Sequence, residues 1–144
     1  MKEYKVKVHS DKTEWFNLEG NLHRDDGPAI ERSNGDKFWY KEGELHRDDG
    51  PAIEWASGSK VWYKEGKYHR DDGPACEWAN GSKEWYKEGK YHRDDGPAVE
   101  CANGGKHWYK EGGKLTEEKF LRSKDSCEGK VVEIDGKKYK LILA

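Results

Sequence analysis

Hydrophobic and polar positions along this chain recur with a fixed period of 23 residues. The segment His-Arg-Asp-Asp-Gly-Pro-Ala begins at His23, His46, His69 and His92. A Trp-Tyr pair keeps the same step, and the full units run 22–44, 45–67, 68–90 and 91–113. Self-similarity at a period of this length is typical of a repeat architecture, in which each unit is stabilised by stacking on its neighbours.

The pattern inside one unit predicts a β-hairpin. In the third unit, residues 74–79 alternate in character, Asn80-Gly81 follows them, and residues 82–87 form the return run. Asn-Gly between two such runs favours a two-residue type I′ turn, since both central residues need positive φ. That turn pairs aliphatic residues with tryptophan, and the expected pairs are Cys76 with Trp85, Ile30 with Trp39, Ile53 with Trp62, and Val99 with Trp108. We therefore expect one apolar face, which also carries Trp55 and Trp78, and one face of Ala, Glu and Tyr.

The connection between hairpins is expected to hold further turns. Gly43, Gly66 and Gly89 suit positions of positive φ. Asp-Asp-Gly-Pro suits another turn, because Asp side chains bond nearby backbone N–H groups. Proline cannot donate to a β-ladder, so each proline is expected at the start of a strand. The predicted fold is mainly β: a single-layer, twisted antiparallel array of four hairpin units.

Shorter segments flank the array. Residues 1–21 are expected to hold a strand near 4–9 and a half repeat with Trp15. Residues 114–144 are expected to form a cap, with a short helix that begins after an N-capping Thr116 and places Phe120 and Leu121 on its apolar face. Two strands joined at Asp135-Gly136 are expected to complete that cap.

Composition narrows the class of protein. Hydrophobic residues make up 33% and charged residues 39% of the chain, but seven tryptophans and eight tyrosines recur periodically and supply apolar area for a thin, ordered sheet. The net charge of −2 with interleaved signs predicts neither nucleic-acid nor membrane binding. No apolar run approaches the roughly 20 residues of a membrane span. Cys76, Cys101 and Cys127 form no C-x-x-C pair, so we expect structural thiols in a reducing compartment, the cytoplasm.

The spacing of Trp85, Tyr86, Gly89, His92, Gly96 and Gly104, repeated in the other units, resembles the MORN repeat. It is most similar to the MORN-like variant of YwqK-type antitoxin-like proteins and of phage and large-virus proteins. Arginine rather than glycine follows the histidine here. The resemblance covers about residues 14–113 and implies a curved β-meander that acts as a binding surface, not a reaction.

Four copies of His-Arg-Asp-Asp are the chief candidates for chemistry. One reaction needs one convergent constellation, so four near-identical copies argue against an enzyme, and no cofactor or metal site is expected. The aspartates are expected to be turn residues, with each arginine paired to a nearby carboxylate. A weaker alternative is an anion-binding row, made of His23, Arg24, His46, Arg47, His69, Arg70, His92 and Arg93. Stacking of single-stranded nucleic acid on the aromatic residues is disfavoured by the glutamates beside the lysines.

The sequence therefore predicts a non-enzymatic protein-binding repeat module. Positions that vary between units are the candidate contacts, and they are Arg32, Trp55, Val61, Trp78, Glu84 and His107. Tryptophan is enriched among residues that dominate binding energy, so Trp55 and Trp78 lead this set. The phage resemblance implies a host protein as the partner and inhibition of a host defence factor as the role. A nucleotide-sequestering protein, an antitoxin-like immunity protein, a membrane-associated scaffold and a homodimer remain alternatives.

Overall fold

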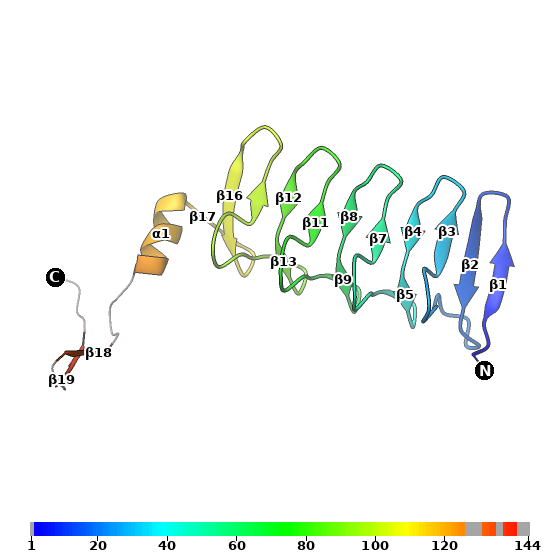
Figure 1. Cartoon of the computed structure of the whole chain (residues 1–144), viewed down its shortest axis with the longest axis horizontal. Coiled ribbons are helices and arrows are strands. Elements are labelled where there is room, and N and C mark those ends of the chain that lie inside the picture. The colour runs from blue at the N-terminus through cyan, green and yellow to red at the C-terminus, as the bar shows by residue number, and fades with distance from the viewer. Residues whose placement is uncertain (1, 126–130, 135–136, 141–144) are drawn as a thin grey trace. The chain divides into compact units, whose positions relative to one another are not determined.

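The computed structural model describes residues 2–125, 131–134 and 137–140, and it confirms the mainly β class (Figure 1). The chain divides into two compact units, Met1–Lys114 and Leu115–Ala144. The residues of the N-terminal half repeat and of the four full repeats thus belong to the first unit, and residues 115–144 form the second.

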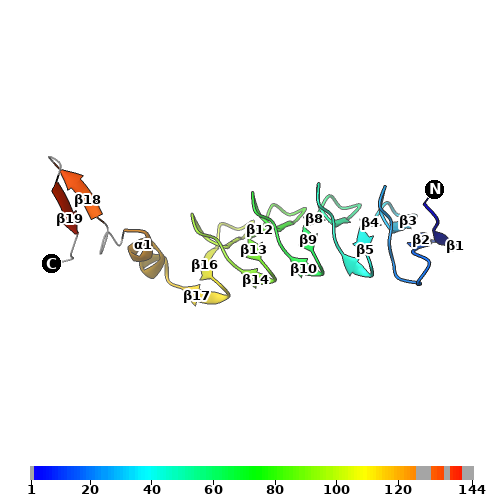
Figure 2. The same ribbon diagram turned by 90° about the horizontal axis from the view of Figure 1, so that it is seen from below.

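The first unit is built on an 11-stranded antiparallel sheet, in which successive hairpins stand side by side in chain order (Figures 1 and 2). Its strands are, in order, β1 (Lys5–Val8), β2 (Lys12–Phe16), β3 (Ile30–Arg32), β4 (Lys37–Phe38), β7 (Ile53–Glu54), β8 (Lys60–Val61), β11 (Cys76–Glu77), β12 (Lys83–Glu84), β15 (Val99–Glu100), β16 (Lys106–Lys110) and β17 (Gly113–Leu115). The expected strand near residues 4–9 is confirmed as β1, at one edge of the sheet.

A second, smaller hairpin follows in each of the first three full repeats. These hairpins are β5 (Tyr40–Lys41) with β6 (Glu44–Leu45), β9 (Tyr63–Lys64) with β10 (Lys67–Tyr68), and β13 (Tyr86–Lys87) with β14 (Lys90–Tyr91). The tryptophan of each repeat lies between the main strand and the smaller hairpin, for example Trp62 between β8 and β9. Each repeat therefore contributes to the long sheet and then turns away from it.

The predicted register of the main hairpins is wrong by one residue. Cys76 pairs with Glu84 and not with Trp85, and Ile53 pairs with Val61. The cause is the turn, which has three residues rather than two. The N–H of Gly81 donates to the carbonyl of Trp78 at 2.9 Å, and Gly81 alone takes the positive φ, at 91°. This is the geometry of a type I turn followed by a G1 bulge, a loop that Asn-Gly also suits. Ile30 and Val99 likewise pair with Phe38 and His107.

The type I′ turn occurs instead at the tip of the smaller hairpin. There Glu65 has φ of 49° and Gly66 of 71°, and Lys64 and Lys67 close the turn. Glu42, Glu88 and Glu111 repeat this conformation, with φ of 49° to 50°. The expectation that the glycine after each of these glutamates has positive φ is confirmed, whereas a left-handed glutamate costs about 1–2 kcal/mol and was not expected.

The one-residue shift decides which side chains meet on each face. The buried core consists of Phe38, Ile53, Val61 and Cys76, and Tyr63, Tyr68 and Tyr86 are among the residues packed against it. Consecutive tyrosine rings of this row, from Tyr63 to Tyr109, lie 4.2 to 4.9 Å apart. The opposite face carries a ladder of alternating charges, in which Glu54 pairs with both Lys37 and Lys60 across the strands. Opposite charges at such sites stabilise a sheet.

Side chains at the hairpin tips link one repeat to the next. Ser59 accepts a hydrogen bond from the N–H of Ala79 at 2.9 Å. In the same way, Asp36 accepts the N–H of Ala56 and Ser82 accepts the N–H of Ala102. The N–H of Ala56 is the main cause that lowers the pKa of Asp36. The fourth repeat has Gly105 at this position. Its lack of an acceptor side chain agrees with its place as the last repeat.

The second unit contains α1 (Glu117–Asp125) and a hairpin of β18 (Val131–Ile134) and β19 (Lys137–Lys140). Thr116 is confirmed as the N-cap, because its Oγ1 accepts the N–H of Lys119 at 3.2 Å. Phe120 is buried, but Leu121 is 50% exposed, so only one of the two expected apolar residues is covered. The turn at Asp135-Gly136 lies outside the described residues.

Two of the expected structural thiols can be placed. Cys76 is buried and Cys101 half-buried, both as free thiols, and burial raises the pKa of Cys76 to about 12. The expectation for Cys127 lies outside the described residues. Within the described parts of the chain, no helix is long and apolar enough to cross a bilayer.

Candidate functional site: the grooves between repeats

Each arginine of the His-Arg-Asp-Asp segment lies over the ring of a tryptophan of the same array. The Arg70 guanidinium carbon is 3.9 Å from the centre of the Trp62 ring. The same stack recurs at 4.2, 4.0 and 3.8 Å for Arg24 on Trp15, Arg47 on Trp39 and Arg93 on Trp85. Tryptophan is the best aromatic ring for a cation–π interaction, and arginine is the cation most often found in one.

The same arginine also makes three hydrogen bonds within the fold. Arg70 Nε donates to Asp72 at 2.9 Å, and its Nη1 donates to the carbonyl of Pro74 at 3.2 Å and to Glu77 at 2.8 Å. A Cβ added at Gly73 would lie 3.1 Å from the guanidinium carbon, so a larger residue there would have to displace the Arg70 side chain slightly. Arg24, Arg47 and Arg93 make the equivalent bonds. The expected pairing of each arginine with a carboxylate is confirmed.

Each histidine joins its own loop to the tip of the small hairpin. Nδ1 of His69 accepts the N–H of Glu88 at 3.2 Å, so the ring proton is on Nε2, which lies 3.0 Å from Asp71. Glu88 is one of the left-handed glutamates, and this bond holds its strained backbone. The equivalent histidine contacts are the main cause that lowers the pKa of Asp48 and Asp94. The histidines thus have a structural part in the repeat.

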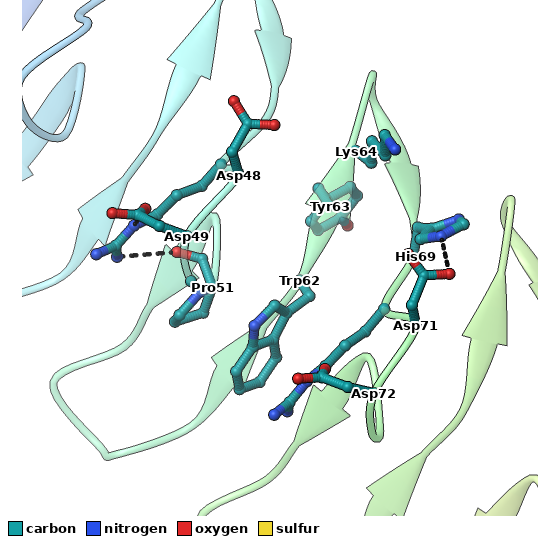
Figure 3. A pocket seen from close by; sticks show the side chains of 12 residues that line it. Asp48, Asp49, Pro51, Trp62, Tyr63, Lys64, His69, Asp71 and Asp72 are labelled. Carbon is teal, nitrogen blue, oxygen red and sulfur yellow. Dashed lines mark hydrogen bonds and ion pairs between the residues drawn. The ribbon is translucent and has the colours of Figure 1, made fainter.

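Between one loop and the next the surface is hollowed into a groove (Figure 3). One wall is the segment 47–51, the other is the segment 69–72, and Trp62, Tyr63 and Lys64 lie between them. The groove has a volume of about 630 Å³. Two further grooves of about 700 and 640 Å³ are formed by the equivalent residues of the adjacent repeats. The array therefore presents the same concave surface three times.

The rims of these grooves are acidic. The side chains of Asp48, Asp49, Asp71 and Asp72 are 78% to 84% exposed, whereas those of Arg47 and Arg70 are only 22% to 23% exposed. Lys64 is the exposed cation of this groove. The carboxylates are therefore presented to solvent while the guanidinium groups are covered by the loop.

The structure brings the members of the expected anion-binding row into one repeating edge, but their side chains are largely covered. The side chains of His46, His69 and His92 are 11% to 12% exposed, and the arginines are bonded as described above. An anion at this edge would meet the exposed aspartates first. The row therefore presents largely covered cationic groups behind exposed carboxylates, which disfavours an anion at this edge.

The variable residues expected to contact a partner lie in several environments. Val61 is 3% exposed and belongs to the core, so it is not available to a partner. Trp55 is half-buried and packs edge-on against Phe38, with ring centres 5.3 Å apart. Arg32 is exposed and lies over Phe38, and His107 is exposed on β16.

Glu84 and Trp78 contact each other. Nε1 of Trp78 donates to one Glu84 oxygen at 2.9 Å, and the hydroxyls of Tyr86 and Tyr91 donate to the other at 3.0 and 3.1 Å. These three donors stabilise the Glu84 carboxylate at a position where the second repeat has the apolar residue Val61. Trp78 remains 37% exposed and is the tryptophan of the expected pair that a partner can reach.

The grooves themselves were not predicted from the sequence. Their floor comes from Trp62, which the sequence had placed on the apolar face opposite Ile53, and from Tyr63, which it had placed on the other face. Among the described residues, no group of three or more His, Cys, Asp or Glu is arranged to hold a metal ion. Comparison of the chain with known protein families, with curated proteins and with solved structures found no match.

Proposed function

We propose that this chain is a non-enzymatic, protein-binding repeat array. The observation that carries the proposal is the threefold repetition of one open groove along a single sheet. A surface repeated at regular spacing suits an extended partner, which can use several equivalent contacts at once. The proposal extends to a MORN-like membership of the array, on the sequence resemblance.

The hydrogen bonds that the arginines and histidines of the repeat make within the fold favour binding over catalysis. Arg70 and His69 are held by bonds within the fold, and Asp71 and Asp72 serve those bonds. A general base or nucleophile needs a side chain free to reach the proton or atom on which it acts. His46 and His69 instead keep both ring nitrogens in hydrogen bonds within the fold, which is the reason to favour recognition over reaction.

The finer role that we propose is inhibition of a host protein by a phage-encoded chain in the host cytoplasm, and it rests on the resemblance alone. An antitoxin-like immunity protein would use the same surface with a toxin as partner. A nucleotide-sequestering role has less support, because the arginines it requires are covered and bonded. A membrane-associated scaffold has less support too, because the groove rims are acidic and would repel anionic lipid.

The test is whether the chain forms a stoichiometric complex. Tagged protein would be incubated with bacterial lysate, and a retained protein would be identified, produced and mixed with the chain for mass determination by light scattering. Trp78→Ala is the surface variant, and Trp55→Ala is a poor choice because Trp55 packs against Phe38. A defined complex of fixed ratio supports the proposal. Recovery of no partner at any salt concentration, or turnover of a substrate by the chain, would overturn it.

A further inference from the structure

The three grooves recur at a distance that the sheet sets. Neighbouring strands lie about 4.8 Å apart and each repeat adds two of them, so equivalent groove positions recur about every 9.6 Å. The tyrosine row supports this value, because its ring centres are 4.2 to 4.9 Å apart and two such steps separate equivalent tyrosines such as Tyr63 and Tyr86. A partner that fills all the grooves must present equivalent side chains at that interval.

The interval distinguishes between partner conformations. A polyproline II segment rises about 3.1 Å per residue with three residues per turn, so every third side chain returns to the same side after about 9.3 Å. In a β-strand, side chains on one side recur after about 6.7 Å. In an α-helix the corresponding step of seven residues is about 10.5 Å, which drifts by nearly 1 Å per groove. The left-handed extended form fits the array best.

The lining of each groove defines which side chain it takes. Trp62 is half-buried and stands between the 48–51 segment and the 69–72 segment (Figure 3), with Arg70 stacked on it. The rims carry four exposed aspartates, whereas Lys64 is the exposed cationic residue among those that line the groove. Asp49 and Glu54 both contact the covered guanidinium of Arg47. Asp72 and Glu77 contact Arg70 in the same way. An aromatic floor under acidic rims is complementary to a cationic side chain, and arginine combines stacking with bonds to carboxylates.

We propose that the grooves bind an extended, polyproline-II-like segment of a partner protein that carries a basic side chain at every third residue, one for each groove. This inference rests on the proposed binding function and names the chemistry of the partner. Its cationic groups lie at the tryptophan floors, on the part of each ring that lines the groove and is not covered by the stacked arginine, between the aspartate pairs of successive loops. Aromatic-lined grooves are a general means of recognising this conformation, whose preformed shape lowers the entropic cost of binding.

The first experiment uses defined peptides and the full chain. A labelled peptide with three arginines, separated by two prolines each, is compared by fluorescence anisotropy with a peptide of the same composition in which the arginines are consecutive. Multivalent contact should make the spaced peptide bind at least about tenfold more tightly. Its affinity should fall as salt is raised. Equal affinity of the two peptides would overturn the spacing argument.

The second experiment neutralises the groove without removing its hydrogen-bond acceptors. In the variant with Asp48, Asp49, Asp71 and Asp72 changed to Asn, each amide oxygen still accepts the bond from His or Arg. The control changes four exposed glutamates outside the grooves to Gln, and they are Glu3, Glu19, Glu44 and Glu117. We expect the groove variant to bind the spaced peptide at least about tenfold more weakly and the control to bind within about twofold of the wild type. Circular dichroism checks that both remain folded.

The outcomes separate this inference from the function proposed above. Unchanged peptide binding by the groove variant would overturn the inference even if a stoichiometric protein partner is found. Peptide binding that depends on spacing and on the aspartates would support the inference even if the lysate yields no complex. A cellular partner retained equally by wild type and groove variant would leave the binding function standing and contradict the groove as its site.

Discussion

Replacement of Arg70 by methionine tests how the repeat is held together. Methionine keeps much of the side-chain volume, but it loses the stack on Trp62 and the bonds to Pro74 and Glu77. The stack is worth about 1 kcal/mol, and the charge-assisted bond to the Pro74 carbonyl about 1.5–2 kcal/mol. Glu77 is 38% exposed, so its ion pair adds only about 0.5 kcal/mol after solvent screening. We expect Arg70→Met to lower the free energy of unfolding by about 3 kcal/mol.

The measurement is urea unfolding followed by tryptophan fluorescence, with hydrogen exchange to locate the loss. Arg70→Lys is the matched control, because lysine keeps the charge but cannot form the planar fork. Arg70→Lys should lower the free energy of unfolding by about 2 kcal/mol, which is most of the loss expected for Arg70→Met. Arg47→Met repeats the change in the adjacent, nearly identical repeat and should give a similar value. If Arg70→Lys were as stable as the wild type, charge alone would suffice and the stacked geometry would not matter.

Three other substitutions test separate features of the repeat. Gly73→Ala should lower the unfolding free energy by about 1 kcal/mol in urea titration, because the new methyl displaces Arg70; an unchanged midpoint would show that the loop adapts freely. Glu65→Asn should raise it by about 0.5 kcal/mol, since asparagine tolerates positive φ better, and a lower melting temperature would contradict the strain argument. The pKa of Asp48 and of Asp94 is lowered in the folded state, so the stability from these groups is complete above the ordinary value of about 3.9 and is lost as pH falls through the lower folded pKa. The double variant with both changed to Asn should therefore lose less stability than the wild type between about pH 5 and about pH 2 in melting experiments, and parallel curves would refute the linkage.

The sequence was sufficient for the repeat and its hairpin architecture, because these follow from exact recurrence and turn residues. It was not sufficient for the register. Val61 and Trp62 are adjacent and both apolar, so either can pair with Ile53 in a plausible apolar face. Asn-Gly and Ser-Gly suit two-residue and three-residue loops alike, and the choice between them moves every cross-strand partner by one position.

The groove could not be predicted for a related reason. Its walls come from loops 23 residues apart, and its floor from a tryptophan that a one-residue register change moves to the opposite face. The left-handed Glu65 was also beyond the sequence pattern, because glutamate is rare in that conformation. Its explanation needs the His46 ring nitrogen, which accepts the Glu65 N–H from 19 positions earlier in the chain.

The near identity of the second and third repeats has a consequence for how this molecule can change over generations. Each hairpin tip supplies the acceptor that the next one uses, from Asp36 through Ser59 to Ser82, and the series ends at Gly105. An in-frame duplication of one middle repeat would leave every such link intact and add one more groove. Slippage between near-identical coding segments can therefore lengthen or shorten the array in whole units. Valency towards an extended partner would then change in steps, without any new contact having to arise by point mutation.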